Sequence, residues 1–151
     1  MKISELGLRE AVTVTPTASV GDVARAMTEQ HTPHVVVVDD NGSVRGVITA
    51  RDLISKHAAL HFPTYFGLLG YSLPIEYRRD QREIDQALAT SAQQLMSTDV
   101  LTIAPDADVE DAATLMMDRN VSCLPVVQGG ALTGVIDESD FVRLLVVEEQ
   151  D

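Results

Sequence analysis

Cysteine is almost absent from the sequence, since Cys123 is the single one among 151 residues. One thiol cannot form an intrachain disulfide, which fits a reducing cytoplasm. Long apolar runs are absent as well: stretches such as 144–147 are far too short to cross a membrane. The first six residues lack the apolar core of a signal peptide. These absences predict a soluble, cytoplasmic protein with no membrane partner.

Basic residues are scarce. The chain has 11 Lys and Arg against 23 Asp and Glu, which gives a formal net charge of −12. From Asp99 onward, the only basic residues are Arg119 and Arg143. Binding to a nucleic-acid backbone depends on clustered Lys and Arg, so nucleic acid is excluded as a partner. We interpret the acidity as a source of solubility, with a cation-binding role as the alternative.

The sequence does contain one pattern twice. Residues 14–16 (VTP) recur 89 positions later as 103–105 (IAP), and 46–52 (GVITARD) recur 88 positions later as 134–140 (GVIDESD). A chain of this length buries roughly 68–70% of its unfolded surface, so both copies fit into one compact unit. Grooves between the two copies are where a ligand would bind.

Each copy predicts the element order β-α-β-β-α. A short β-rich run stops at a proline, which cannot donate to a sheet ladder, and a capping-box pattern then opens an amphipathic helix. Two strands joined by a glycine-bearing turn follow, and a final helix begins near Thr49 or Asp137. These runs are 12–15, 19–27, 35–38 and 44–48 in the first copy, and 100–103, 108–116, 124–127 and 132–136 in the second.

This ordered set of motifs, present twice, resembles a pair of CBS motifs, or Bateman module. The resemblance implies an α+β (α/β) fold with two repeats related by a pseudo-twofold axis. It assigns 1–57 to the first repeat and 94–151 to the second. Between them, 58–93 is an insert that holds five of the six aromatic residues and is similar to inserts in stand-alone bacterial CBS pairs. Such an insert covers either the molecule's own sheet or a dimer or partner surface.

The resemblance also implies a function. In CBS pairs the grooves bind adenosine-containing ligands such as AMP, ADP, ATP or S-adenosylmethionine, and the module senses rather than catalyses. We therefore expect a regulatory sensor that is not an enzyme and needs no cofactor, with Mg²⁺ accompanying a phosphorylated ligand. Such modules usually form disc-like homodimers. The alternative is a structural or interaction module with vestigial grooves, which acts through dimerisation or through a protein partner at the insert.

The residues at 46–52 support a ligand site on physical grounds. A helix that begins after Thr49 directs backbone N–H groups into the groove, where they can bind an anion. The Thr49 hydroxyl and Arg51 can donate to a phosphate, and Asp52 is an acceptor suited to paired ribose hydroxyls. Thr49 and Asp52 also fit a capping box that only stabilises the helix start, and this interpretation stays open.

Carried over from the family, each groove combines the turn of one repeat with a strand and the preceding segment of the other. The main groove is expected to contain Val47, Thr49, Arg51, Asp52, Met96, Ser97, Thr98, Val121, Ser122, Cys123 and Leu124. The lesser groove is expected to contain Thr32, Pro33, His34, Val135, Asp137 and Asp140. No catalytic residue and no metal ligand is expected in either groove.

The second copy departs from the first. Asp137 replaces Thr49 and would repel a phosphate, and Ser139 replaces Arg51, so no basic counterpart is expected there. His34 is expected to offset part of this acidity. We predict unequal grooves: the Thr49 groove accepts a phosphorylated nucleotide, whereas the Asp137 groove stays empty or holds a nucleoside-like ligand or a metal-bridged phosphate. Cys123 stands where the family often has a basic residue, which weakens the case for phosphate binding.

Overall fold

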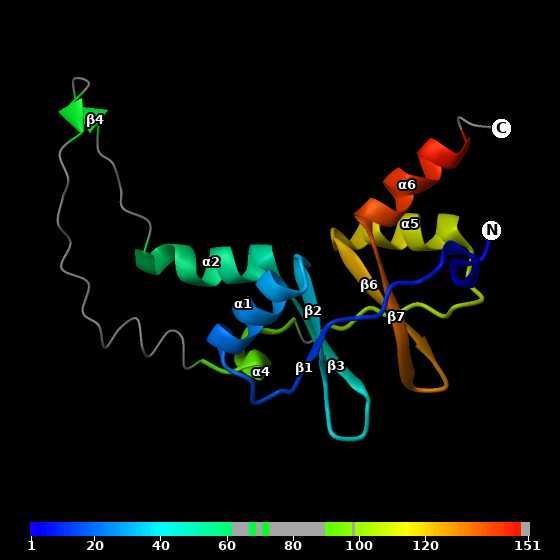
Figure 1. Cartoon of the computed structure of the whole chain (residues 1–151), viewed down its shortest axis with the longest axis horizontal. Helices are drawn as coiled ribbons and strands as arrows, with labels where there is room; N and C mark the ends of the chain where they lie inside the picture. Colours follow the sequence, from blue (N-terminus) through cyan, green and yellow to red (C-terminus); the bar gives the residue numbers. More distant parts are fainter. Residues whose placement is uncertain (62–66, 69–70, 73–89, 98, 149–151) are drawn as a thin grey trace.

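The computed structural model describes residues 1–61, 67–68, 71–72, 90–97 and 99–148. Two similar halves make up the fold (Figure 1). The first half contains β1 (Thr13–Val14), α1 (Val20–Glu29), β2 (His34–Val38), β3 (Val44–Thr49) and α2 (Ala50–His61). The second half contains α5 (Val109–Arg119), β6 (Cys123–Gln128), β7 (Ala131–Asp137) and α6 (Glu138–Glu148). The predicted mixed α and β fold with two repeats is confirmed.

The other described elements are short. The 3-10 helix η1 (Ile3–Leu6) opens the chain, and α4 (Ala92–Leu95) precedes the second half. Strand β4 (Gly67–Leu68) pairs with β5 (Tyr71–Ser72) inside the predicted insert. The insert's aromatic residues Phe62, Tyr65, Phe66 and Tyr77 lie outside the described residues, so its role stays a prediction.

Each half is built on a β-hairpin. β2 pairs antiparallel with β3 and parallel with β1, and β6 pairs antiparallel with β7. The predicted strand at 100–103 is wrong, because within the described part of the chain this segment makes a single parallel bridge, between Ile103 and Val126. In the first half, Val36 N donates to Val12 O at 2.9 Å. Its counterpart Pro125 has no N–H to donate, so the second ladder is shorter.

The two first helices begin differently. At α1 the predicted capping box is complete: Ser19 Oγ accepts from Asp22 N at 3.1 Å, and Asp22 Oδ2 accepts from Ser19 N at 3.1 Å. At α5 the prediction is only partly right. Asp108 is the N-cap residue, but its side chain makes no capping bond and instead pairs with Lys2 Nζ at 2.8 Å. The start of α5 is thus tied to the beginning of the chain.

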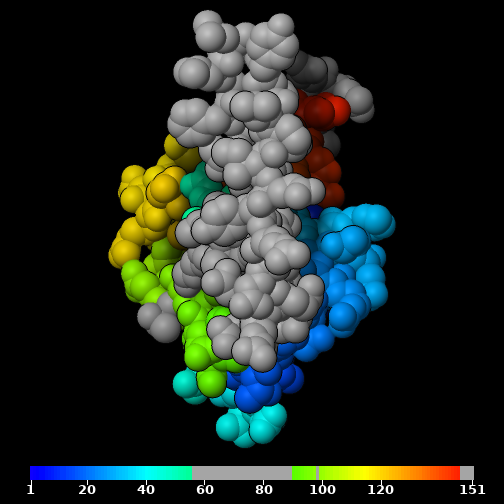
Figure 2. Space-filling view, turned by 90° about the vertical axis from the view of Figure 1, so that its left-hand side faces the viewer, coloured from blue at the N-terminus to red at the C-terminus, as the bar shows by residue number. Residues whose placement is uncertain are grey.

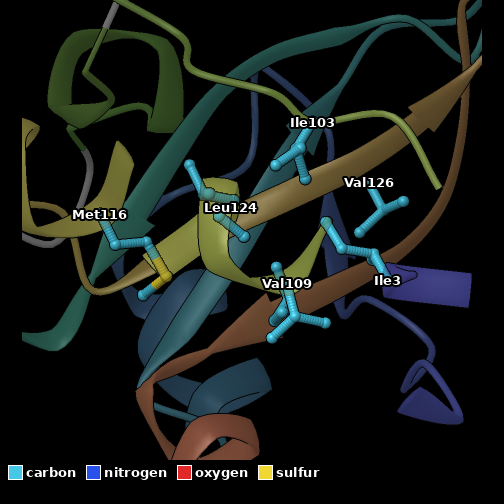
Figure 3. Close-up of a cluster of buried hydrophobic side chains, with 8 residues drawn as sticks. Ile3, Ile103, Val109, Met116, Leu124 and Val126 are labelled. Carbon is cyan, nitrogen blue, oxygen red and sulfur yellow. The ribbon is translucent and has the colours of Figure 1, made fainter. Parts of the chain in front are cut away.

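The hydrophobic cores show that the halves exchange their leading segments. Residues 2–9, the N-terminal segment, place Ile3 in the core of the second half, where it points into a cluster with Val109 and Leu124 (Figure 3). Residues 90–97, the crossing segment, place Ala92 and Leu95 in the core of the first half. Figures 1 and 2 both show the crossing segment, in green, beside the blue elements of the first half. The segment that precedes the first half in sequence therefore packs into the core of the second half, and the segment that precedes the second half packs into the core of the first.

Candidate ligand grooves

One cavity of about 910 Å³ is lined by residues of both halves. Its volume lies within the range of small-molecule sites, which is about 300–1,000 Å³. The lining includes these predicted main-groove residues: Val47, Thr49, Arg51, Asp52, Ser97, Val121, Ser122 and Cys123. It also includes Pro33, His34 and Asp137 of the predicted lesser groove. The two helix-start turns therefore face one continuous space.

Other predicted groove residues lie elsewhere. Met96 packs against the core of the first half, and Leu124 is fully buried in the core of the second. Neither Val135 nor Asp140 lines the cavity. Val135 N donates to Arg9 O at 3.2 Å, and the carboxylate of Asp140 is held by arginines. Thr32 does not line it either, and its hydroxyl donates to His34 O at 3.0 Å. Thr98 lies outside the described residues.

The structure adds cavity residues that the sequence analysis missed. They come from the segment before α5, from α5 itself, from the residue that ends it, and from the starts of α2 and α6: Ala50, Asp99, Val100, Leu101, Ala113, Met116, Met117, Arg119, Asn120, Glu138, Ser139 and Phe141. Arg119 adds a cation that lies on a different half from Arg51. The sequence held one indication of Arg119: it and Arg143 are the only basic residues after position 98.

The turn at Thr49 is a working helix cap. Asp52 Oδ2 accepts from Thr49 N at 2.8 Å, and Thr49 Oγ1 accepts from Asp52 N at 3.2 Å. Ala50 N donates to Pro33 O at 2.7 Å, which joins the turn to the segment before β2. Among the residues that the structure describes, no side chain caps the Arg51 amide. The capping-box interpretation is therefore confirmed, and the turn still offers Arg51 and the positive helix end to an anion.

The corresponding turn at Asp137 is paired within the molecule. Asp137 Oδ1 accepts from Ser139 N at 2.9 Å and from Ser139 Oγ at 2.5 Å. Asp137 Oδ2 lies 2.6 Å from Arg9 Nη2 and 2.8 Å from His34 Nε2. The prediction that no basic residue serves this turn is wrong, because Arg9 reaches it from the N-terminal segment. His34 lies at this carboxylate, as the predicted lesser groove has it, and its charge there stays a prediction.

These contacts set the ionisation of Asp137. Burial by itself would raise the pKa of this carboxyl, but hydrogen bonds from Arg9, Ser139 and His34 hold the pKa far below the ordinary value for aspartate. Asp137 is therefore charged at neutral pH although only 6% of the residue's surface is exposed. An anion brought to this turn would meet a fixed negative charge.

Cys123 lies at the cavity wall and is 5% exposed. Burial raises the pKa of its thiol to about 12, and the charges of Asp137, Asp52 and Glu138 act in the same direction. Because the thiolate is the reactive form, Cys123 is not suited to be a nucleophile. Within the described part of the chain, no three His, Cys, Asp or Glu side chains are arranged to hold a metal ion.

The model of the CBS domain matches this chain twice, at residues 3–58 and at 92–147. An uncharacterized protein of Methanopyrus kandleri is 26% identical over 145 residues, which are 95% of this chain and 62% of that protein. A homoserine O-acetyltransferase of Methanococcoides burtonii is 28% identical over 95% of this chain and 24% of its own length. The chain thus spans less than two thirds of these relatives.

Solved structures share the fold. A CBS-domain containing protein from Agrobacterium tumefaciens has a TM-score of 0.73 at 23% identity, covering 96% of this chain and 99% of that one. CBSX2, solved in complex with AMP, has a TM-score of 0.72 at 22% identity, covering 98% of each chain. The CBS domain pair of protein MJ0100, solved with 5′-methylthioadenosine and S-adenosyl-L-methionine, has a TM-score of 0.74 at 20% identity, also covering 98% of each. Among the described residues, no helix is long and apolar enough to cross a membrane.

Proposed function

Because the chain belongs to the CBS domain family, we propose that it is a non-catalytic regulatory module that binds an adenosine-containing ligand at the Thr49–Asp52 turn. The observation that carries the proposal is the cavity of about 910 Å³ that this turn lines together with residues of the other half. The solved complexes of CBSX2 with AMP and of MJ0100 with S-adenosyl-L-methionine support this ligand class, although both are related to this chain through the fold alone.

The proposed roles follow from the chemistry of the lining. A carboxylate has several acceptor positions, so Asp52 can cap the helix and still accept from ribose hydroxyls. Arg51 and Arg119 line the cavity from opposite halves and can donate to a phosphate. Val100 and Leu101 supply apolar surface for the base. Binding would join the two halves through one ligand, which is how a sensor of this kind would transmit occupancy.

The charge of the cavity lining favours some adenosine-containing ligands over others. Apart from the Cys123 thiol, the ionisable groups that line it among the described residues are four carboxylates, two guanidinium groups and one imidazole: Asp52, Asp99, Asp137, Glu138, Arg51, Arg119 and His34. A triphosphate would meet this acidity with too few cations unless Mg²⁺ accompanied it. We therefore favour a ligand with a single phosphate, such as AMP, or with a cationic group, such as S-adenosylmethionine.

The test is calorimetry and thermal unfolding of the purified chain with AMP, ATP and S-adenosylmethionine, each with and without Mg²⁺. A ligand at about 100 times its dissociation constant should stabilise the protein by roughly 2.7 kcal/mol, which raises the midpoint by about 5–10 °C. Asp52→Asn keeps an oxygen for the cap but removes the charge, and it should abolish the shift. Asp22→Asn makes the same change in the capping box of α1, outside the cavity, and should leave the shift intact. If none of these ligands shifts wild type, the proposal is wrong.

A second candidate function is that of an interaction module. Large apolar side chains are exposed on α2 and α6: Ile54 at 57%, Val142 at 61%, Leu145 at 63% and Val146 at 55%. Exposed apolar surface of this kind is typical of an association face, so we propose that α2 and α6 support a homodimer. Light scattering should show a dimer in wild type and a monomer in Val142→Ser with Leu145→Ser. If wild type is already a monomer, this role is excluded.

A further inference from the structure

The first groove is the main groove at the Thr49–Asp52 turn, and the second groove is the lesser groove at the Asp137–Asp140 turn. Arg9 occupies the position in the second groove that Ser97 occupies in the first. Ser97 forms an antiparallel bridge with Val47, and Arg9 forms the equivalent bridge with Val135. Each bridge contains one hydrogen bond, although the donors differ: Ser97 N donates to Val47 O at 3.3 Å, whereas Val135 N donates to Arg9 O at 3.2 Å. The pseudo-symmetry therefore puts a small hydroxyl beside one helix-start turn and a long cation beside the other.

The side chain of Arg9 binds both carboxylates of its turn. Arg9 Nη2 lies 2.6 Å from Asp137 Oδ2 and 3.2 Å from Asp140 Oδ2. The two aspartate side chains are only 8% and 9% exposed, whereas that of Arg9 is 39% exposed. In the first groove, the counterparts Thr49 and Asp52 line the cavity. In the second, Asp140 does not line it, and its carboxylate is paired with Arg9 and Arg143.

The backbone holds Arg9 at this place. A Cβ atom on Gly134 would lie 2.9 Å from Arg9 O and 3.1 Å from Leu8 Cβ, so only glycine permits so close an approach. Earlier in the N-terminal segment, Ile3 is fully buried in the second core, and Lys2 pairs with Asp108 at the start of α5. The contacts of the N-terminal segment thus fix the position of the Arg9 guanidinium in the groove.

We propose that Arg9 is an internal occupant of the second groove that excludes an adenosine ligand there. The chain then binds one ligand, at the Thr49–Asp52 turn. An incoming ribose would have to displace the guanidinium from Asp140, and an incoming phosphate would face Asp137. The inference rests on the proposed function for the identity of the ligand, and it makes Arg9 the residue that determines stoichiometry.

The test converts the second groove into a copy of the first. Arg9→Ser with Asp137→Thr gives it the Ser and Thr that stand at positions 97 and 49. Calorimetry with AMP and with S-adenosylmethionine should show one site per chain in wild type and two in the double variant. Arg9→Lys keeps a cation and is the matched control, with one site expected. If Arg9 only stabilises the fold, the double variant should unfold at a lower temperature and still bind no more than one ligand.

The outcomes separate the two proposals. No binding to wild type with one site in the double variant would defeat the proposed function and support the role of Arg9. One site in both would overturn the role of Arg9 alone, and so would two sites in wild type. No site in either protein would overturn both.

Hydrogen exchange on wild type covers the case in which the double variant does not fold. Saturating AMP should slow exchange at 47–52 and 99–101 and leave residues 3–9 unchanged. Altered exchange at 3–9 would mean that ligand enters the second groove and displaces Arg9, which overturns the inference.

Discussion

His34 Nε2 on β2 lies 2.8 Å from Asp137 Oδ2 at the end of β7, so a buried contact joins the two halves of the molecule. The side chains are 5% and 8% exposed. The pseudo-symmetric positions are Cys123 and Thr49, which carry no charge at neutral pH, because burial raises the pKa of the Cys123 thiol to about 12. The Asp137 position therefore carries a charged carboxylate, whereas neither Cys123 nor Thr49 is charged, although the backbones correspond.

The charged carboxylate of Asp137 predicts a pH-dependent stability. The folded pKa of Asp137 is lowered, mainly by Arg9 once burial is overcome, so its contribution is present above the unfolded value of about 3.9 and is lost as the pH falls toward the folded pKa. Asp137→Asn should lower the free energy of unfolding at pH 7 by about 2–3 kcal/mol, since it leaves Arg9 without its closest partner. Urea unfolding from pH 7 to 3 measures both proteins.

The difference between wild type and Asp137→Asn should shrink as the pH falls below about 4. Asp22→Asn is the control for a capping aspartate that is exposed, and it should cost far less at pH 7. A gap between wild type and Asp137→Asn that widens on acidification would contradict the assignment of the lowered pKa to this group.

Two glycines allow the exchanged segments to approach the sheets. A Cβ on Gly46 would lie 2.7 Å from Met96 Sδ and 2.8 Å from Met96 Cβ, and a Cβ on Gly134 would lie 2.9 Å from a backbone oxygen. Gly46→Ala and Gly134→Ala should each lower the free energy of unfolding by about 1–3 kcal/mol. Thermal unfolding measures the effect. In α1, Gly21→Ala meets only Ser19 Oγ at 3.7 Å and should be neutral or stabilising by up to about 1 kcal/mol.

Met96 offers a rescue for one of the two variants. Met96→Ala should restore part of the stability of Gly46→Ala, since it removes Met96 Sδ and Cγ, which would lie 2.7 and 2.8 Å from the new Cβ. The Cβ of residue 96, at 2.8 Å, remains, so the rescue is incomplete. No side-chain change can relieve the clash of Gly134→Ala with the carbonyl oxygen of Arg9. Equal destabilisation by Gly21→Ala would show that the close contacts are not the cause.

Features that depend on neighbouring residues could be predicted from the sequence, whereas contacts between distant positions could not. The turn at 49–52 was recognisable because a capping box lies within four residues, and the structure has both of its hydrogen bonds. The loss of the strand at 100–103 follows from Pro125, a residue visible in the sequence but read only as part of its own strand. Arg9 was missed because it reaches Asp140 across 131 positions, and hydrophobic periodicity carries no information about such a contact.

Two residues in left-handed conformations predict opposite effects of substitution. His31 follows the end of α1 with φ of 51°, and Asn120 is the C-cap of α5 with φ of 52°. Asparagine and glycine tolerate this region better than other residues, so His31→Gly should raise the free energy of unfolding by about 0.5–1 kcal/mol. Asn120→Ala should lower it by a similar amount. Urea unfolding tests both, and destabilisation by His31→Gly would mean that its side chain makes contacts worth more than the strain.

Cys123 predicts a chemical result. With the pKa of its thiol near 12, almost no thiolate exists at pH 8, and the residue is 5% exposed. Iodoacetamide at pH 8 should therefore label the native chain far more slowly than the chain in urea, as followed by mass spectrometry, because the thiolate is the attacking species. Asp137→Asn removes the nearest charge that raises this pKa, yet burial is the larger cause, so labelling should stay slow if the variant is folded. Rapid labelling of native wild type would place Cys123 in an open, polar part of the cavity and would make it a candidate for contact with the ligand's phosphate.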